Sequence, residues 1–507
     1  MFETVNATHT QRKLEMLGKG QVKVSARLDL NTACKKVLSA TAKCFLTQPV
    51  ERGDNGEVRI SGRVVTRIIF TDEFDGFNSE EKTETFTERV TLKNAGAVSI
   101  NAAALVLETT VGDNAGTSVE VDTVIDLMLV GLVEKEVRFV SALTGQAEAR
   151  REKMQISTFD RAIDERFSAD ERLELDKNCA GVLGVDCGAC VRDIYAEDGR
   201  VTIKGTVSAN VITIKNGETT TMSNAVHEFD FSKVIHVQGL SAEDTVFGNV
   251  AVAGVTVHAE NKGKPELAVE VDLTFGGHIV VTREIEYVAD AFSGDFALNF
   301  SAGQAEHVNA LPQVNSVLDV EGNMTMPANA PYIARILTAT GAHITGANIM
   351  CADGKVTIEG VIAASVVYEC EERQIHSHEA AVPFSAAVRV EGVGADFAIQ
   401  ATASVVSCYV KARRGKELML DAKLGVSIGA TEFGTRDLTA DITQGEPKTR
   451  DDSAIVIVLP EAGETLWDIA KRIGMPTNEI VRQNPACETG IPAGEKIFLY
   501  RQQVINF

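Results

Sequence analysis

Hydrophobic and polar residues alternate with a period of two along several stretches of the chain. In the first, the apolar positions are Val58, Ile60, Val64, Ile68 and Phe70, and the polar positions between them are Arg59, Ser61, Arg63 and Arg67. A second stretch repeats the pattern, with Val201, Ile203, Val207, Ala209 and Val211 against Thr202, Lys204, Thr206, Ser208 and Asn210. Strands with one buried and one solvated face give this alternation in antiparallel sheets. The pattern therefore predicts a chain built mainly of antiparallel β-strands.

These stretches belong to three copies of one unit, at residues 54–70, 197–214 and 352–369. Each copy has a turn glycine, a second glycine six residues later, and a phenylalanine 24 residues after that: Gly56, Gly62 and Phe86; Gly199, Gly205 and Phe229; Gly354, Gly360 and Phe384. Matching leucines precede the copies and matching aspartates follow them: Leu38, Leu183 and Leu337; Asp122, Asp272 and Asp421. The turn glycine is expected to supply a positive φ, and the second to mark a bulge or a close backbone approach. A period of about 150 residues indicates a triplicated domain, because solenoid repeats are shorter.

We therefore expect a mainly β fold, with three tandem β-sandwich-like domains of about 150 residues and a small βααβ domain. The predicted domains are residues 1–155, 156–305 and 306–446, followed by a polar linker at 447–453 and the small domain at 454–502. Few segments before residue 453 show the periodicity of a helix. The best candidate, at residues 147–172, is charged and weakly periodic, and is expected to connect the first two copies.

The pattern changes after residue 454. Residues 455–458 read as a short strand, and the next apolar positions fall at helical spacing: Leu466, Ile469, Ala470 and Ile473. Thr465 and Asp468 predict a capping box at the start of this helix, and Gly474 its end. A second short helix at 477–483 and a closing strand near residue 499 complete a βααβ order.

This module resembles a LysM domain over its whole length, in the segments GETLWDIAKRIGM, NEIVRQNP and IPAGEKIFL. The resemblance implies binding of N-acetylglucosamine-containing glycans in a shallow groove between two loops. The residues that it assigns to a partner- or glycan-binding site are Gly463, Glu464, Thr465, Leu466, Trp467, Asn484, Pro485, Ile491 and Pro492. The competing interpretation of Leu466, Trp467 and Ile491 is that they simply form the core of a small domain.

The three copies resemble the SPOCS domain of spore-coat proteins, through the strand unit D-G-x-V-x-I-x-G-x-V and the acidic stretch after it. Several SPOCS-like copies followed by one LysM domain is the architecture of SipL-like spore coat assembly proteins. The resemblance implies a non-enzymatic scaffold in the mother-cell cytoplasm, at the forespore surface. Its LysM module would bind the coat morphogenetic ATPase that forms the basement layer, and its β repeats would recruit or encase other coat proteins.

Charge and cysteine content indicate which partners and which cellular compartment to expect. The 507 residues carry 49 basic and 71 acidic side chains, a net charge of −22, and no long basic run, so binding to nucleic acid is not expected. Nine scattered cysteines, an odd number, favour a reducing compartment. The polar start of the chain predicts no secretory signal, and no apolar stretch is long enough to predict insertion into a membrane. A peptidoglycan-binding wall protein remains the alternative, and it would require export.

Other candidate chemistry is weak. Cys187 and Cys190 form a single C-x-x-C on a predicted strand, where their side chains would point to opposite faces. His376 and His378 share a strand face but have no third ligand nearby in the sequence. The three matching aspartates are expected to end strands and to make turns or hydrogen bonds. We therefore predict no catalytic residue, no metal site and no cofactor, which leaves an all-β enzyme carried to glycan by its LysM domain as the least supported alternative.

Overall fold

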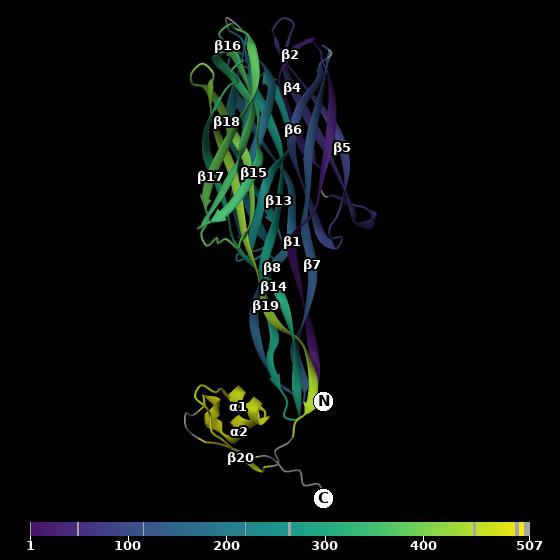
Figure 1. Ribbon diagram of the computed structural model, residues 1–507, viewed down its shortest axis with the longest axis vertical. Helices are drawn as coiled ribbons and strands as arrows, with labels where there is room; N and C mark the ends of the chain where they lie inside the picture. Colours follow the sequence, from purple (N-terminus) through teal and green to yellow (C-terminus); the bar gives the residue numbers. More distant parts are fainter. Residues whose placement is uncertain are drawn as a thin grey trace.

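The computed structural model describes residues 2–47, 50–114, 116–217, 220–261, 265–449, 453–491 and 496–500. It shows an elongated molecule in which a broad head made of strands narrows to a stalk, with a small helical module beside the end of the stalk (Figure 1). The N-terminus also lies at that end. The mainly β fold predicted from the sequence is confirmed.

Each repeat forms two antiparallel sheets. The longer sheets have the strand orders β1(Phe2–Asp29)-β7(Ser118–Gly145)-β6(Ala97–Asn114), β8(Glu148–Glu174)-β13(Pro265–Phe292)-β12(Thr245–Asn261) and β14(Phe296–Thr325)-β19(Glu417–Pro447)-β18(Ala398–Ala412). The shorter sheets are β2(Cys34–Leu46)-β4(Glu57–Asp72)-β5(Phe77–Thr91) with a two-residue β3(Glu51–Arg52), then β9(Cys179–Glu197)-β10(Arg200–Lys215)-β11(Thr221–His236), then β15(Ile333–Ala352)-β16(Lys355–Cys370)-β17(Ile375–Arg389). Buried residues of both sheets form one core in each repeat, so each is a sandwich.

The first and last strands of each repeat are far longer than the sandwich needs. They pair as β1 with β7, β8 with β13, and β14 with β19, and continue below the head as the stalk (Figure 1). Strand pairing therefore divides the repeats at residues 146–147 and 293–295, whereas the predicted boundaries at 155 and 305 fall inside β8 and β14.

The expected helical connector at residues 147–172 is a strand, and that prediction was wrong. Strand β8 pairs with β13 from Glu148 opposite Phe292 to Glu174 opposite Glu266. Most of its charged residues are exposed, and Lys153 forms an ion pair of 2.7 Å with Glu284. Because the stalk is narrow, much of each strand is exposed, and charged residues occupy both phases of the alternation. The sequence therefore loses its period of two and resembles a weak helical pattern.

The repeated glycines have the two roles that their spacing predicts. The turn glycines Gly56, Gly199 and Gly354 have φ values of 77°, 77° and 73°. The second glycines leave room for a phenyl ring on the neighbouring strand, because a Cβ on Gly62 or Gly360 would lie 2.9 Å from the ring of Phe86 or Phe384. In the second repeat the ring over Gly205 belongs to Phe231 instead of Phe229, since the β10–β11 hairpin is two residues longer.

The three repeats lie side by side around a common axis and share buried residues. The matching leucines Leu38, Leu183 and Leu337 meet in one cluster with the equally matched Ile69, Ile212 and Val367. In the stalk, Val140, Val288 and Ile442 from the three long hairpins form a second shared cluster. The tandem repeats therefore pack as one body, in which each copy keeps its own sandwich core and contributes to the clusters buried between the repeats.

Candidate partner-binding module

The C-terminal module has the predicted βααβ order. It consists of β20(Ile455–Val458), α1(Leu466–Ile473), α2(Thr477–Gln483) and β21(Ile497–Tyr500), with β20 and β21 paired in antiparallel fashion. The polar linker expected at 447–453 joins it to β19, and residues 450–452 of this linker lie outside the described residues. The core of the module is formed by Val458, Ile469, Ile480, Ile497 and Leu499.

Local signals in the sequence fix the first helix. The Thr465 hydroxyl accepts a hydrogen bond from the Asp468 backbone N–H at 3.2 Å, and the Asp468 carboxylate accepts one from the Thr465 N–H at 3.0 Å. This reciprocal pair is the predicted capping box, which satisfies N–H groups that the first turn of a helix leaves free. Gly474 ends the helix in the left-handed region, at φ 68°.

The polar residues assigned to the binding groove are already used inside the module. Glu464 forms an ion pair of 2.9 Å with Arg472. The Asn484 side chain donates to the Phe498 carbonyl at 2.8 Å and accepts from the Phe498 N–H at 3.3 Å, so it ties the end of α2 to β21. With Thr465 in the capping box, these groups have fewer hydrogen bonds left for a sugar.

The remaining predicted site residues divide into core and surface. Leu466 and Ile491 are half-buried and pack against the module core. Gly463 is exposed, with φ 86°, and Pro485 is exposed at the start of a short 3₁₀ turn, Pro485–Glu488. Pro492 lies outside the described residues. The structure thus places this set around one end of α1 and the segment after α2.

Trp467 faces the stalk. Its indole N–H donates to the Asp290 carboxylate at 2.8 Å, and its ring meets the Phe292 ring edge-on, with the centroids 5.1 Å apart. The Arg150 guanidinium lies 5.8 Å from the centre of the indole ring. The Lys471 ammonium donates to both oxygens of Asp290, at 2.7 and 2.9 Å. Trp467 therefore attaches the module to the second repeat.

Asp290 is the polar centre of this contact. Burial alone would raise the pKa of its carboxyl, but the hydrogen bonds from Lys471 and Trp467 and the charge of Lys471 outweigh burial and hold the pKa below its ordinary value. Asp290 is therefore ionised when the module is docked, which keeps it a strong acceptor for both donors.

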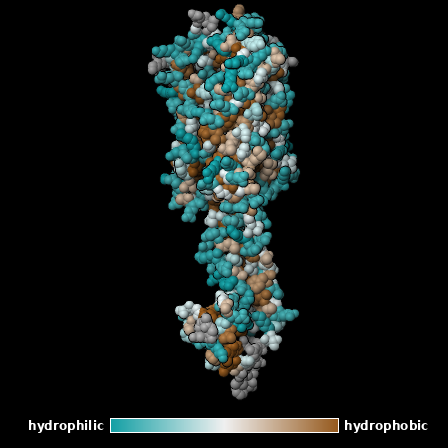
Figure 2. Space-filling model, turned by 60° about the vertical axis from the view of Figure 1, so that its left-hand side comes forward, coloured by the Kyte–Doolittle hydropathy of each residue, from teal (hydrophilic) through white to brown (hydrophobic). Residues whose placement is uncertain are grey.

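A second surface of the module is apolar and open. The outward side chains of the two strands form cross-strand pairs, Ile455 opposite Tyr500 and Ile457 opposite Phe498, and these four residues are 44–59% exposed. We call them the outer sheet face. Apolar surface is visible at this end of the molecule (Figure 2). Contiguous exposed apolar residues on a soluble domain mark an interaction surface.

Sequence reasoning missed the outer sheet face. The signal was present, because β20 reads Ile-Val-Ile-Val and β21 reads Ile-Phe-Leu-Tyr, with apolar side chains in both phases of the alternation. A two-stranded sheet covered by helices on one side needs only one apolar phase for its core. The second phase therefore had no structural explanation in the sequence.

Comparison with known families agrees with this geometry. A sequence model of the SPOCS domain of SipL matches residues 180–260 and 332–413, and a model of the LysM domain matches residues 461–499. The chain carries SPOCS and LysM domains. The matched SPOCS segments cover β9 to β12 in the second repeat and β15 to β18 in the third, and the LysM match covers both helices of the module. The resemblance seen in the sequence is thereby confirmed for the second and third repeats and for the LysM module.

These families are non-catalytic binding domains, so the domain content is that of a sporulation or cell-wall-binding protein, and the LysM domain supports binding to peptidoglycan-type glycans. No curated protein and no solved structure matched the chain.

The remaining candidate residues from the sequence, the cysteine pair and the histidine pair, lie in regular strands. Cys187 and Cys190 lie on β9 with no irregularity between them, and burial raises the pKa of the Cys187 thiol to about 11. The His376 ring stacks on Tyr368, with the centroids 5.7 Å apart. Across the residues that the structure describes, no group of three potential ligands is placed to hold a metal ion, and no helix is long and apolar enough to span a membrane.

The three matching aspartates do not end strands, so that prediction was wrong. They lie within β7, β13 and β19, because the strands run on into the stalk. Two of them are held by cross-strand lysines: Asp122 by Lys23 at 2.8 Å and Asp421 by Lys411 at 2.6 Å. These two pair with polar side chains as expected, but inside a strand and not at its end.

Proposed function

We propose that this protein is a non-enzymatic scaffold of spore coat morphogenesis, acting in the mother-cell cytoplasm at the forespore surface. Its LysM domain docks to the coat basement-layer ATPase, and its SPOCS repeats recruit or encase other coat proteins. The observation that carries the proposal is the outer sheet face, formed by Ile455, Ile457, Phe498 and Tyr500.

The outer sheet face favours a protein partner over a sugar. It offers aliphatic and aromatic side chains without charge, the composition that enriches the centres of protein–protein interfaces. The groove residues Glu464, Thr465 and Asn484 are meanwhile engaged in internal hydrogen bonds and ion pairs. Leu466 and Ile491 are the half-buried apolar residues of the predicted site, and they pack against the module core.

The test is a pull-down of the purified coat ATPase by the full-length chain. We expect Ile457→Asp to weaken capture about tenfold or more, because it places a charge at the centre of the face. The matched control is Val234→Asp, an equally drastic change at an exposed valine of β11 in the head. Unchanged capture by a folded Ile457→Asp variant, and by Leu466→Asp and Ile491→Asp as well, rejects this docking site.

The alternative is a cell-wall protein whose LysM domain binds N-acetylglucosamine-containing glycan. The LysM match itself supports it. Incubating the full-length chain with insoluble peptidoglycan separates the two functions. Retention on the polymer that persists in Ile457→Asp, together with no capture of the ATPase, favours the glycan function.

A further inference from the structure

The three repeats meet at three junctions, which the internal symmetry makes comparable. Between repeats 2 and 3, the edge strand β18 packs on β9. The Ser404 hydroxyl donates to the Ala189 carbonyl at 3.2 Å, and the Val405 carbonyl lies so close to Gly188 that a Cβ there would be 2.6 Å from the oxygen. Val406, the extra residue of a bulge in β18, is only 8% exposed. This junction is closed by strand-on-strand packing.

The junction between repeats 1 and 2 is also bridged. The edge strand β12 approaches the first repeat, where the Arg63 guanidinium donates to the Ala253 carbonyl at 3.1 Å. Arg67 reaches from β4 to the Val185 carbonyl of β9 at 3.2 Å. Two of the three junctions therefore hold the edge strand of one repeat against its neighbour.

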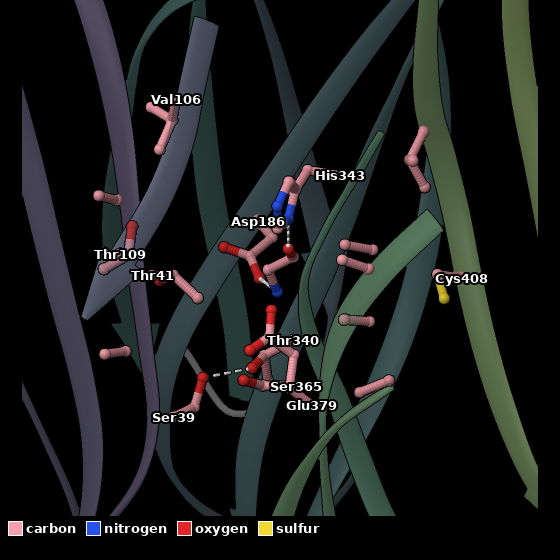
Figure 3. Close-up of a pocket in the computed structure, with 18 of the residues that line it drawn as sticks. Ser39, Thr41, Val106, Thr109, Asp186, Thr340, His343, Ser365, Glu379 and Cys408 are labelled. Carbon is pink, nitrogen blue, oxygen red and sulfur yellow. Dashed lines mark hydrogen bonds between the residues drawn. The ribbon is translucent and has the colours of Figure 1, made fainter. Parts of the chain in front are cut away.

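The third junction, between repeats 3 and 1, is open. A cavity of about 840 Å³ separates β6 from β15, and strands of all three repeats line it. Figure 3 shows Val106 and Thr109 of β6 on one side, and Thr340 and His343 of β15 on another. Leu107, the bulge residue of β6 that corresponds to Val406, is 38% exposed. Its neighbours Leu105 and Val111 are exposed too.

The sequence explains why this junction does not close. By sheet register, the position of Gly188 in β9, opposite Ser208, is taken in β15 by His343, opposite Ala363. The β15 backbone is also irregular here, with a register shift between Thr340 and His343 and a positive φ of 64° at Gly341. A strand that bends away at this point does not pack against β6 as β9 packs against β18.

We propose that the open junction binds an extended, apolar segment of a partner protein, which adds as a strand to the edge of β6 at residues 105–111 and places side chains in the cavity. The closed junction identifies the occupant, because a β-strand with small side chains covers the equivalent of β6 there. The volume lies within the range of about 300–1,000 Å³ typical of binding pockets. An edge strand supplies unpaired backbone groups for such an addition.

Charge defines the occupant further. The Asp186 carboxylate at the cavity wall is already neutralised by Arg67 and Lys43 and accepts a hydrogen bond from the Gly341 N–H. Exposed Glu108 and Glu379 also line the cavity. The site therefore suits an uncharged strand with basic flanking residues. This inference rests on the proposed scaffold function for the choice of a protein as the ligand.

The experiment uses the full-length chain and a fluorescent peptide of alternating valine and threonine with a lysine at each end. We expect saturable binding by fluorescence anisotropy, weakened about tenfold by Leu107→Asp. The matched control is Val98→Asp, at an exposed valine of the same strand outside the cavity lining. A peptide with N-methylated backbone amides should not bind, because it cannot pair as a strand.

Equal binding to Leu107→Asp and to the unmodified chain overturns the proposal, as does undiminished binding of the N-methylated peptide. A concentration-dependent dimer that Leu107→Asp abolishes overturns it in favour of a second copy as the occupant. Both aspartate substitutions are at exposed positions, and a second variant, Leu105→Asp, repeats the test two residues away. No coat ATPase is present, so failure here is distinguishable from failure of LysM docking.

Discussion

The head and the LysM domain are joined to the molecule in different ways. In the head, each repeat contributes to a cluster buried between the repeats, where the matching residues Leu38, Leu183 and Leu337 are each less than 7% exposed. The LysM domain has a small core that takes in a single stalk residue, Phe292, and it contacts the stalk further through Trp467 and Lys471 and by Gly474 against Gly294. Surface shared among repeats cannot be released without unfolding, whereas a few polar and aromatic contacts can. The comparison identifies the LysM domain as the part that can separate.

The largest expected effect is on the head. Asp186 connects the three repeats, because it pairs with Arg67 of the first and accepts from the Gly341 N–H of the third. Asp186→Ala leaves the buried Arg67 without a counter-charge, and we expect it to lower the free energy of unfolding by about 3–5 kcal/mol. Chemical denaturation of the full-length chain measures this loss.

The chain supplies the matched control. Positions equivalent to Asp186 carry Thr41 and Thr340, and the position equivalent to Arg67 carries Ser365 in the third repeat. The double variant Asp186→Thr with Arg67→Ser removes both charges together, and should recover much of the stability lost in Asp186→Ala. A double variant as unstable as the single one contradicts the assignment of Asp186 as a charge-paired connector.

The sequence predicts the individual repeats and the LysM domain well, and their arrangement poorly. Alternation identified the strands around Val58 and Val201, and the capping pair Thr465 and Asp468 located helix α1. These are local signals, set by the pattern of burial and by backbone hydrogen bonds within a few residues. The equivalence of Leu183 with its counterparts was also evident, but that they would meet on one axis was not, since their contact depends on packing between repeats.

The stalk and the candidate site show why the rest was missed. Residues 148–174 form a strand because β13 lies beside them, and no local signal reports a partner that is distant in the sequence. The contact between Trp467 and Asp290 spans 177 residues for the same reason. The resemblance to LysM domains assigned Trp467 to a binding site, and in the structure that side chain contacts the stalk.

A smaller effect is expected at the docking contact. Asp290→Ala removes the acceptor for both Trp467 and Lys471, and should weaken docking of the LysM domain by about 2 kcal/mol. Trp467 is the single tryptophan of the chain, so its emission reports docking directly. We expect a red shift in Asp290→Ala with the unfolding of the head unchanged. The matched control is Glu270→Ala, at an exposed acidic residue of the same strand β13, which should leave the emission in place.

The smallest effect is a dependence of docking on pH. Docking lowers the pKa of Asp290, so its contribution is present above the ordinary aspartate pKa of about 4 and is lost as the pH falls through the docked value. The Trp467 emission should therefore shift to the red in the acid range before the head unfolds. Asp290→Asn cannot titrate, and its emission should not change over that range. If the asparagine variant shows the same acid transition, another group controls docking. Ionised Asp290 then does not hold the LysM domain against the stalk.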